Sequence, residues 1–273
     1  QPAIAEPLGM QGSRLEVSVH LVTGNRTRSR TLLSCVNRAG VEAIEMVFEP
    51  LAAGEAVLTH DEKELGALVL DLGAGGTEYA LYQDGEVSLS AVLPVSSSHF
   101  TNDLAMVLRT PFAEAERLKT NHGCCLEALV GDDEGISVPA VAGGAGRVVP
   151  RRELCEILHA RAEELFGLVH RDLARNGYEG ELRGGVVLTG GGAQLDGLLE
   201  LAEQIFNCSV RYGLPQGLGG LVDVIGSPAW TTASGLLLYG RAALDEQRKK
   251  TKGTGFSVRS MMDSLRNMLA DLV

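Results

Sequence analysis

Alternation of apolar and polar positions predicts β-strands in two parts of the chain. The first is a single strand at residues 15–22, with every second side chain apolar. The second, residues 67–95, is interrupted by two turns and predicts three consecutive strands. Shorter strands are expected at residues 41–47 and at residues 184–188.

Helical periodicity, with apolar residues three and four positions apart, fills much of the remaining chain. The helices expected on this basis cover about residues 27–38, 50–58, 99–108, 111–122, 151–176, 195–206 and 230–243. The acidic run 61–64 is interpreted as a solvated turn, and residues 127–150 as a small insert of strands and loops. The order of strands and helices predicts an α/β fold with two lobes.

The last segment, residues 256–273, has a continuous apolar stripe at helical spacing and follows a polar linker, residues 245–255. Residues 248–273 carry six basic and two acidic side chains, a net +4, which leaves −15 on the other 247 residues. Such a helix can lie in the headgroup plane of an anionic membrane, or it can pack as a core helix on its own domain. The polar linker favours the membrane-bound arrangement of the helix over packing on its own domain. The side chains expected to enter it are Phe256, Met261, Met262, Leu265, Met268, Leu269 and Leu272.

Composition narrows the function classes. The 273 residues carry a formal charge of −11, which argues against a nucleic-acid partner because phosphate binding requires a basic face. No run reaches the roughly 18–20 apolar residues of a membrane-spanning helix. The five cysteines form no CxxC pair, as expected for reduced thiols in the cytosol. Because the chain starts at Gln1 without an initiator Met, we expect a fragment that lacks its natural N-terminus.

The first candidate site is the glycine-rich turn DLGAGGTE, residues 71–78, between two predicted strands. A dinucleotide-binding loop passes from a strand into a helix, so this hairpin is a different device. Its backbone N–H groups can surround phosphate oxygens, and Asp71 can hold Mg²⁺ through water. The alternative is a tight hairpin whose glycines serve only its geometry.

Three further segments have a chemical and a structural interpretation. Gly190, Gly191, Gly192 and Ala193 join a buried strand to a helix, as a ligand-binding loop or as a plain turn. Glu116 and Lys119 share one helical face, where they could bind ribose hydroxyls or form a surface ion pair. Glu49 ends a predicted strand before a Pro-started helix; it could orient a water molecule or simply favour the helix dipole.

The order of these motifs is more specific than any one of them. EPLAAG, then DLGAGGTE, AERLKTNHG and VVLTGGGAQLDGL, resembles the actin-like ATPases, and within them the bacterial cell-division family FtsA. Residues 17–54 look like the end of the inserted SHS2 subdomain of that family, and the polar linker with its amphipathic helix matches the family's ending. The resemblance implies an actin-like, two-lobed α/β fold with the remnant of an SHS2 subdomain.

The resemblance also implies site roles. Asp71, Gly73, Gly75, Gly76 and Thr77 match the family's second phosphate loop, with Asp71 holding Mg²⁺ through water. Gly190, Gly191, Gly192 and Ala193 match the adenosine loop, Glu116 and Lys119 match the ribose-contacting pair, and Glu49 matches a water-orienting residue. The first phosphate loop of the family is absent from this sequence, so half of the phosphate clamp is missing.

The implied domains, in order, are residues 1–45 (end of SHS2 and return to the core), 46–66 (connecting helix of lobe 1), 67–125 (lobe 2 with the phosphate-binding hairpin), 126–184 (insert with a long helix), 185–244 (lobe 2 with the adenosine loop), 245–255 (linker) and 256–273 (membrane-targeting helix).

The function implied by the resemblance is an ATP-binding and Mg²⁺-binding protein of cell division. It would polymerise with itself, bind the FtsZ C-terminal tail through the insert, and tether FtsZ filaments to the cytoplasmic side of the inner membrane at the septum. We expect at most a weak ATPase. The alternatives are a PilM-like actin-fold adaptor of type IV pilus assembly and a small-molecule kinase of the same superfamily.

Overall fold

A five-stranded mixed sheet forms the centre of the computed structural model, which describes residues 9–131, 134–141, 144–220 and 222–253. Its strands are β1 (Ala67–Leu72), β2 (Thr77–Gln83), β3 (Glu86–Leu93), β6 (Gly185–Thr189) and β7 (Val210–Tyr212), in the order β3-β2-β1-β6-β7. β2 pairs antiparallel with both β1 and β3, as the two sequence turns predicted. β6 and β7 continue the sheet in parallel with β1.

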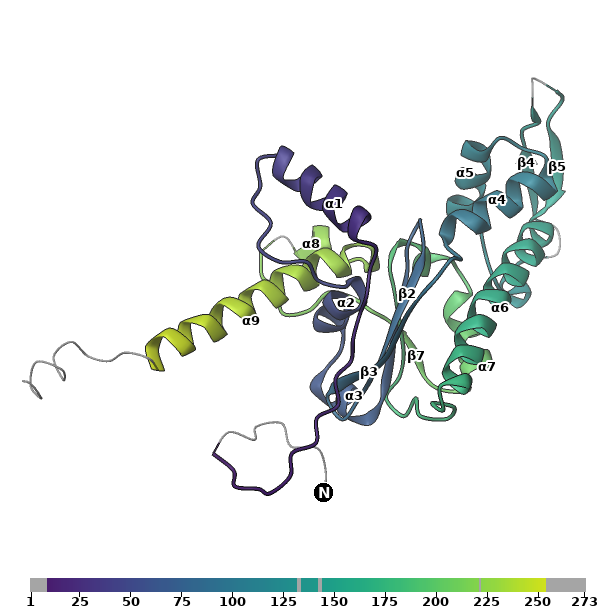
Figure 1. Cartoon of the computed structure of the whole chain (residues 1–273). Coiled ribbons are helices and arrows are strands. Elements are labelled where there is room, and N and C mark those ends of the chain that lie inside the picture. The colour runs from purple at the N-terminus through teal and green to yellow at the C-terminus, as the bar shows by residue number, and fades with distance from the viewer. Residues whose placement is uncertain (1–8, 132–133, 142–143, 221, 254–273) are drawn as a thin grey trace, which may run out of the picture.

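Helices cover both faces of this sheet (Figure 1). On one face lie α4 (Ser97–Leu108), α6 (Arg151–Arg175) and α7 (Leu198–Phe206), and on the other α2 (Glu49–Val57), α3 (His60–Leu65) and α9 (Thr231–Gly253). Alternate residues of β1 therefore enter two different cores: Leu68 and Leu70 pack on the α6 side, and Val69 on the α2 side. This double burial explains why ALVLDL is almost continuously apolar.

The remaining elements extend from this layered centre. α5 (Phe112–His122), the 3₁₀ turn η1 (Glu127–Leu129) and the two-stranded sheet β4 (Gly135–Val138) and β5 (Arg147–Pro150) gather around α4 and the first turns of α6 (Figure 1). The other short turns are η3 (Gly191–Gln194), α8 (Val222–Ile225) and η4 (Pro228–Trp230). No helix in the described ranges is both long enough and apolar enough to cross a membrane.

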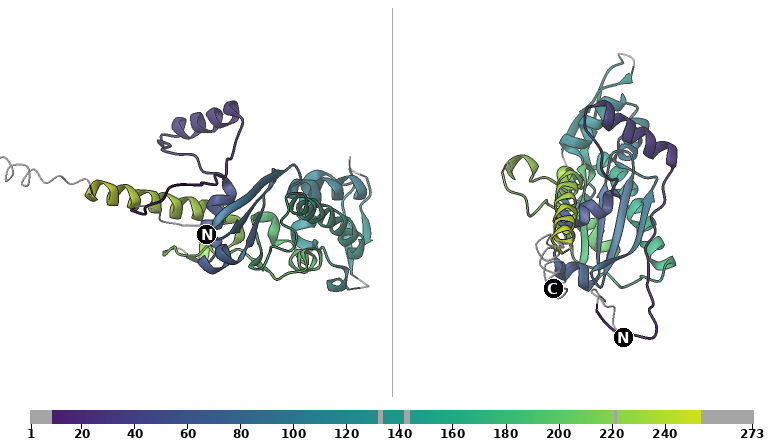
Figure 2. Two further views of the ribbon diagram at one scale, coloured as in Figure 1. Left: turned by 60° about the horizontal axis from the view of Figure 1, so that its bottom comes forward. Right: turned by 60° about the vertical axis from the view of Figure 1, so that its left-hand side comes forward.

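Helices α2 and α9 cross at a glycine. A Cβ atom at Gly235 would lie 1.7 Å from the carbonyl oxygen of Ala52, so only glycine allows this approach. α9 is also longer than predicted: it passes through residue 243 and continues to Gly253, across most of the expected linker. In Figure 1 and in the left view of Figure 2 this helix projects away from the sheet. The expected helix at 256–273 lies outside the described residues.

The predictions for the first 47 residues were half wrong. α1 (Arg26–Arg38) forms as expected, capped by Asn25, whose side chain accepts from the N–H groups of Thr27 and Arg28. The strands expected at 15–22 and 41–47 do not form among the described residues. The apolar side chains of the first one are exposed, Leu15 by 77% and Leu21 by 79%. A strand requires backbone hydrogen bonds to a neighbour, and neither segment pairs in this way with a described strand. Residues 15–22 contact β3 through a side-chain hydrogen bond, between His20 and Ser90.

Two smaller corrections concern local signals. The acidic run 61–64 is part of helix α3 instead of a turn, because Thr59 and Glu62 form a reciprocal capping box at its start. β7, a strand of three residues that pairs with β6, was not predicted. Strands this short produce no measurable alternation.

A candidate nucleotide site beside the glycine turn

The turn between β1 and β2 is the hairpin that the sequence predicted. Asp71 pairs with Glu78 and Leu72 with Thr77 across the two strands, and the N–H of Gly73 donates to the carbonyl of Gly76 at 3.0 Å. Residues 73–76 thus form a closed four-residue loop, called the 73–76 turn below. It lies at the carboxyl end of β1, the edge of an α/β sheet where ligands usually bind.

The second glycine segment lies directly against this turn. Gly190 has φ +84°, and a Cβ there would lie 2.3 Å from Oδ1 of Asp71 and 2.6 Å from the carbonyl of Leu72. Glycine is therefore required at 190 both by the left-handed backbone and by the packing.

After Gly190, Gly191–Gln194 form a 3₁₀ turn, and α7 begins only at Leu198. A Cβ at Gly191, in contrast, would meet nothing within 4 Å.

A cavity of about 540 Å³ opens between these segments and helices α4 and α5. Four of the predicted site residues line it: Glu116, Lys119, Gly191 and Gly192. Ala193, which was also predicted, is fully buried behind it. Sequence reasoning missed the other lining residues, which are Leu72, Ala74, Ser97, Phe100, Thr120, Asn121, Gly123, Gln194, Leu195 and Asp196. Eight of these residues lie within the motifs DLGAGGTE, AERLKTNHG and VVLTGGGAQLDGL, although no role was predicted for them; Ser97 and Phe100 lie outside every motif.

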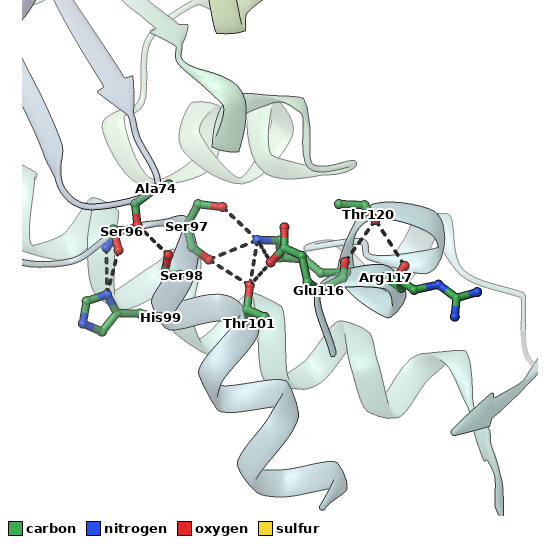
Figure 3. A network of polar contacts seen from close by, with 10 residues as sticks. Ala74, Ser96, Ser97, Ser98, His99, Thr101, Glu116, Arg117 and Thr120 are labelled. Atoms are coloured by element: carbon green, nitrogen blue, oxygen red, sulfur yellow. Dashed lines mark hydrogen bonds and ion pairs between the residues drawn. The ribbon is translucent and has the colours of Figure 1, made fainter. Parts of the chain in front are cut away.

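Glu116 and Lys119 are partners in a polar network at the cavity wall (Figure 3). The Lys119 ammonium lies 2.9 Å from Oε2 of Glu116, and the hydroxyl of Thr101 donates to the same oxygen. Burial alone would raise the pKa of Glu116, but the bonds from Thr101 and Lys119 and the lysine charge lower it. Oε1 has no hydrogen-bond partner among the described residues, and the side chain is 44% exposed. Glu116 can therefore accept hydrogen bonds from a ligand in the cavity.

A second group of polar side chains lies on the opposite face of the hairpin. Asp71 is 6% exposed, and its Oδ2 accepts a hydrogen bond of 2.8 Å from the hydroxyl of Thr232 on α9. Burial raises the pKa of Asp71, the Thr232 bond opposes this, and the charge of Glu49 raises it further. Burial, Glu49 and Asp71 together raise the pKa of Glu78 to about 7. The structure thus brings Glu49, at the start of α2, into electrostatic reach of the turn.

Sequence reasoning did not single out Glu78. Its carboxylate reaches over the glycine turn, since a Cβ at Gly76 would lie 2.9 Å from Oε1 of Glu78. The available signal was register: the residue opposite Asp71 in a hairpin with a four-residue loop is position 78, and it is acidic. Thr77, opposite Leu72, is fully buried, and its Oγ1 is the one buried side-chain oxygen or nitrogen of the described chain that lacks a hydrogen-bond partner.

The donor set fits a magnesium ion that a ligand carries in, and not an ion held by the protein alone. Within the described residues, no three His, Cys, Asp or Glu side chains are grouped closely enough to hold a metal. Asp71 offers carboxylate oxygens at the turn, and a cation there would offset the burial and the Glu49 charge that raise its pKa. Mg²⁺ keeps most of its waters and takes one or two carboxylates together with phosphate oxygens, which matches this arrangement.

Replacing Glu78 with glutamine should make the chain more stable at pH 8 but not at pH 5. The raised pKa of Glu78 means that the folded state holds a proton which the unfolded state releases near pH 4.5, so stability falls as the pH rises towards 7. Glutamine removes that penalty. Thermal unfolding at the two pH values measures the effect, with Glu86→Gln, an exposed acid on β3, as the control. An equal shift of the melting temperature at both pH values would contradict the assignment.

A family model described as cell division protein FtsA matches residues 68–235, well over half of the chain. The chain belongs to the FtsA family. It is 42% identical over 258 residues to the cell division protein FtsA of Pseudomonas aeruginosa, a match that covers 94% of this chain and 60% of the relative. The family resemblance is confirmed, and the chain spans about three fifths of the length of that relative.

Solved structures agree on the fold. MreB 5 of Spiroplasma citri bound to AMPPNP has a TM-score of 0.69 at 18% identity, over 83% of this chain and 68% of that one. The PilM–PilN type IV pilus biogenesis complex has a TM-score of 0.58 at 19% identity, over 78% and 57%. At these identities the likeness shows the fold alone, and it confirms the predicted actin-like α/β architecture of this FtsA-family chain.

Proposed function

We propose that this FtsA-family chain binds ATP with Mg²⁺ in the cavity beside the 73–76 turn. The observation that carries the proposal is the cavity of about 540 Å³, which both predicted glycine segments adjoin and which Glu116 enters from α5. Support also comes from the AMPPNP bound to MreB 5, a protein of the same fold. The nucleotide should supply phosphate charge and bring its magnesium ion.

Different residues of the chain would then contact different parts of the nucleotide. The backbone N–H groups of Gly75 and Gly76 offer donors to phosphate oxygens, and the unpaired hydroxyl of Thr77 can add one. The N–H of Gly73, which was also predicted to bind phosphate, is bonded to the carbonyl of Gly76. Asp71 was predicted to hold the hydrated ion; its carboxylate lies on the face of the hairpin away from the cavity, so the ion would have to lie on that side of the turn. Gly191 and Gly192 leave space for the adenosine, and the free oxygen of Glu116 would accept from sugar hydroxyls. Lys119 was also predicted to contact the ribose.

We expect at most weak ATP hydrolysis. Glu49 was predicted to orient a water molecule, and its charge reaches Asp71 and Glu78 on the face of the hairpin away from the cavity. Glu78 is a further candidate base, because its pKa of about 7 allows it both to take up and to release a proton at neutral pH.

We further propose that the chain polymerises and tethers FtsZ filaments to the cytoplasmic side of the inner membrane at the division septum. Family membership supports cell division over the two alternatives, the PilM-like adaptor and the small-molecule kinase. The FtsZ tail would dock on residues 126–184, where α6 presents a long, partly exposed and charged helix. The SHS2 remnant in residues 1–45 and the membrane helix in 256–273 stay predictions.

Co-sedimentation with anionic liposomes tests the tether. The full chain should pellet, and a chain that ends at Thr254 should not, because the truncation removes the amphipathic helix. Adding salt should weaken binding by screening the basic residues from 248 onwards. Met262→Glu, which places a charge in the apolar stripe, should behave like the truncation, whereas Asn267→Ser on the polar face should not. Equal pelleting of the full and truncated chains would refute the tether.

A further inference from the structure

The ammonium group of Lys119 contacts four acceptor atoms of the protein. Its side chain is 8% exposed, and Nζ donates to Oγ of Ser97 at 2.9 Å, to the carbonyl of Ser97 at 3.2 Å and to the hydroxyl of Thr101 at 2.8 Å. Oε2 of Glu116 completes the set at 2.9 Å. An ammonium has three hydrogens, so these four acceptors already use its full capacity.

Ser97 and its neighbour connect this ammonium to the phosphate side of the site. The N–H of Ser97 donates to the carbonyl of Gly73 at 2.9 Å, and the hydroxyl of Ser98 donates to the carbonyl of Ala74 at 2.6 Å. Figure 3 shows this path, from Glu116 across Thr101 and Ser97 to Ser98 and Ala74. The first turn of α4 is therefore bonded to α5 on one side and to the 73–76 turn on the other.

We propose that Lys119 is a positioning residue that couples the Glu116 side of the cavity to the 73–76 turn through the first turn of α4. The inference rests on the proposed nucleotide binding and departs from the ribose contact predicted for this lysine. A ligand hydroxyl that donates a hydrogen bond to Glu116 would share this carboxylate with the Lys119 ammonium. Since the ammonium also holds Ser97, sugar binding and the position of the turn are linked. A nucleoside phosphate would contact both Glu116 and the 73–76 turn, whereas a nucleoside would contact only the Glu116 side. Binding of the phosphate should therefore depend more strongly on Lys119.

Calorimetric titration of the full chain with ADP and with adenosine tests the coupling. Lys119→Met should weaken ADP binding at least tenfold and adenosine binding less than threefold, because the turn loses its support while the sugar side keeps Glu116. Ser98→Ala, which removes one exposed hydroxyl that bonds the carbonyl of Ala74 and not the ammonium, should show the same bias. The double variant should bind ADP no worse than Lys119→Met alone, since both changes break one path. Arg117→Met, on the exposed face of α5, is the matched control.

The opposing outcomes are distinct. Equal loss for ADP and adenosine in Lys119→Met would show that the lysine contacts the sugar, and would overturn the inference. Additive losses in the double variant would mean that the lysine acts on phosphate through its own charge, which also overturns it. If Lys119→Met does not fold, Ser98→Ala alone must show the ADP bias or the inference fails. An unchanged chain that binds neither ligand refutes the proposed function itself, and this inference with it.

Discussion

Gly235→Ala is expected to lower the free energy of unfolding by at least about 3 kcal/mol. The added methyl would lie 1.7 Å from the carbonyl oxygen of Ala52, and a backbone atom of a packed helix cannot move aside as a flexible side chain can. The two helices must separate instead. Their separation also shifts Thr232, whose hydroxyl holds Asp71. Chemical denaturation monitored by circular dichroism measures the change.

Gly240→Ala on the same helix is the matched control with the opposite expected sign. A Cβ at position 240 meets nothing within 4 Å, so the substitution adds helix propensity without a clash. It should raise the free energy of unfolding by about 0.5–1 kcal/mol. If both alanines change stability alike, the close crossing of α2 and α9 is not a determinant of the fold.

Gly191→Leu is expected to weaken nucleotide binding at least tenfold and to leave the melting temperature nearly unchanged. Position 191 is exposed, lines the cavity and has open space where a side chain would begin. A leucine there would fill part of the volume proposed for the adenosine without disturbing the core. Titration with ADP, next to a thermal melt of the same sample, separates the two effects.

Gly219→Leu is the control for that experiment. Gly219 also has no atom within 4 Å of its would-be Cβ, but it lies away from the cavity lining. It should therefore bind ADP as the unchanged chain does. If Gly191→Leu binds ADP with the affinity of the unchanged chain, the cavity is not the nucleotide site.

The hairpin around the 73–76 turn is the part of the site that could be predicted best. Its signals are local: a short apolar run marks β1, apolar alternation marks β2, and the glycines between them set the turn. The same holds for α5, where the spacing of Glu116 and Lys119 alone places them on one helical face. Motif order then identified the family, because four weak motifs in one sequence are far more specific than any of them.

Long-range contacts set the remaining features. Sequence spacing showed that Lys119 could reach Glu116, but only packing of α5 against α4 brings Ser97 and Thr101, 22 and 18 residues away, to its ammonium. Glu49 and Thr232 come from elements far from the hairpin, and both affect the charge state of Asp71. No periodicity in a sequence reports which elements become neighbours.

The sequence by itself determined the helices, the hairpin and the family of this chain, because turn chemistry, caps and periodicity act within a few residues. Tertiary structure decided whether apolar alternation became a strand. Residues 15–22 alternate as clearly as β2 does, yet they stay unpaired where β2 has a neighbour on each side. A strand buries its apolar face and satisfies its backbone only against another strand, so its existence depends on the partner and not on its own pattern.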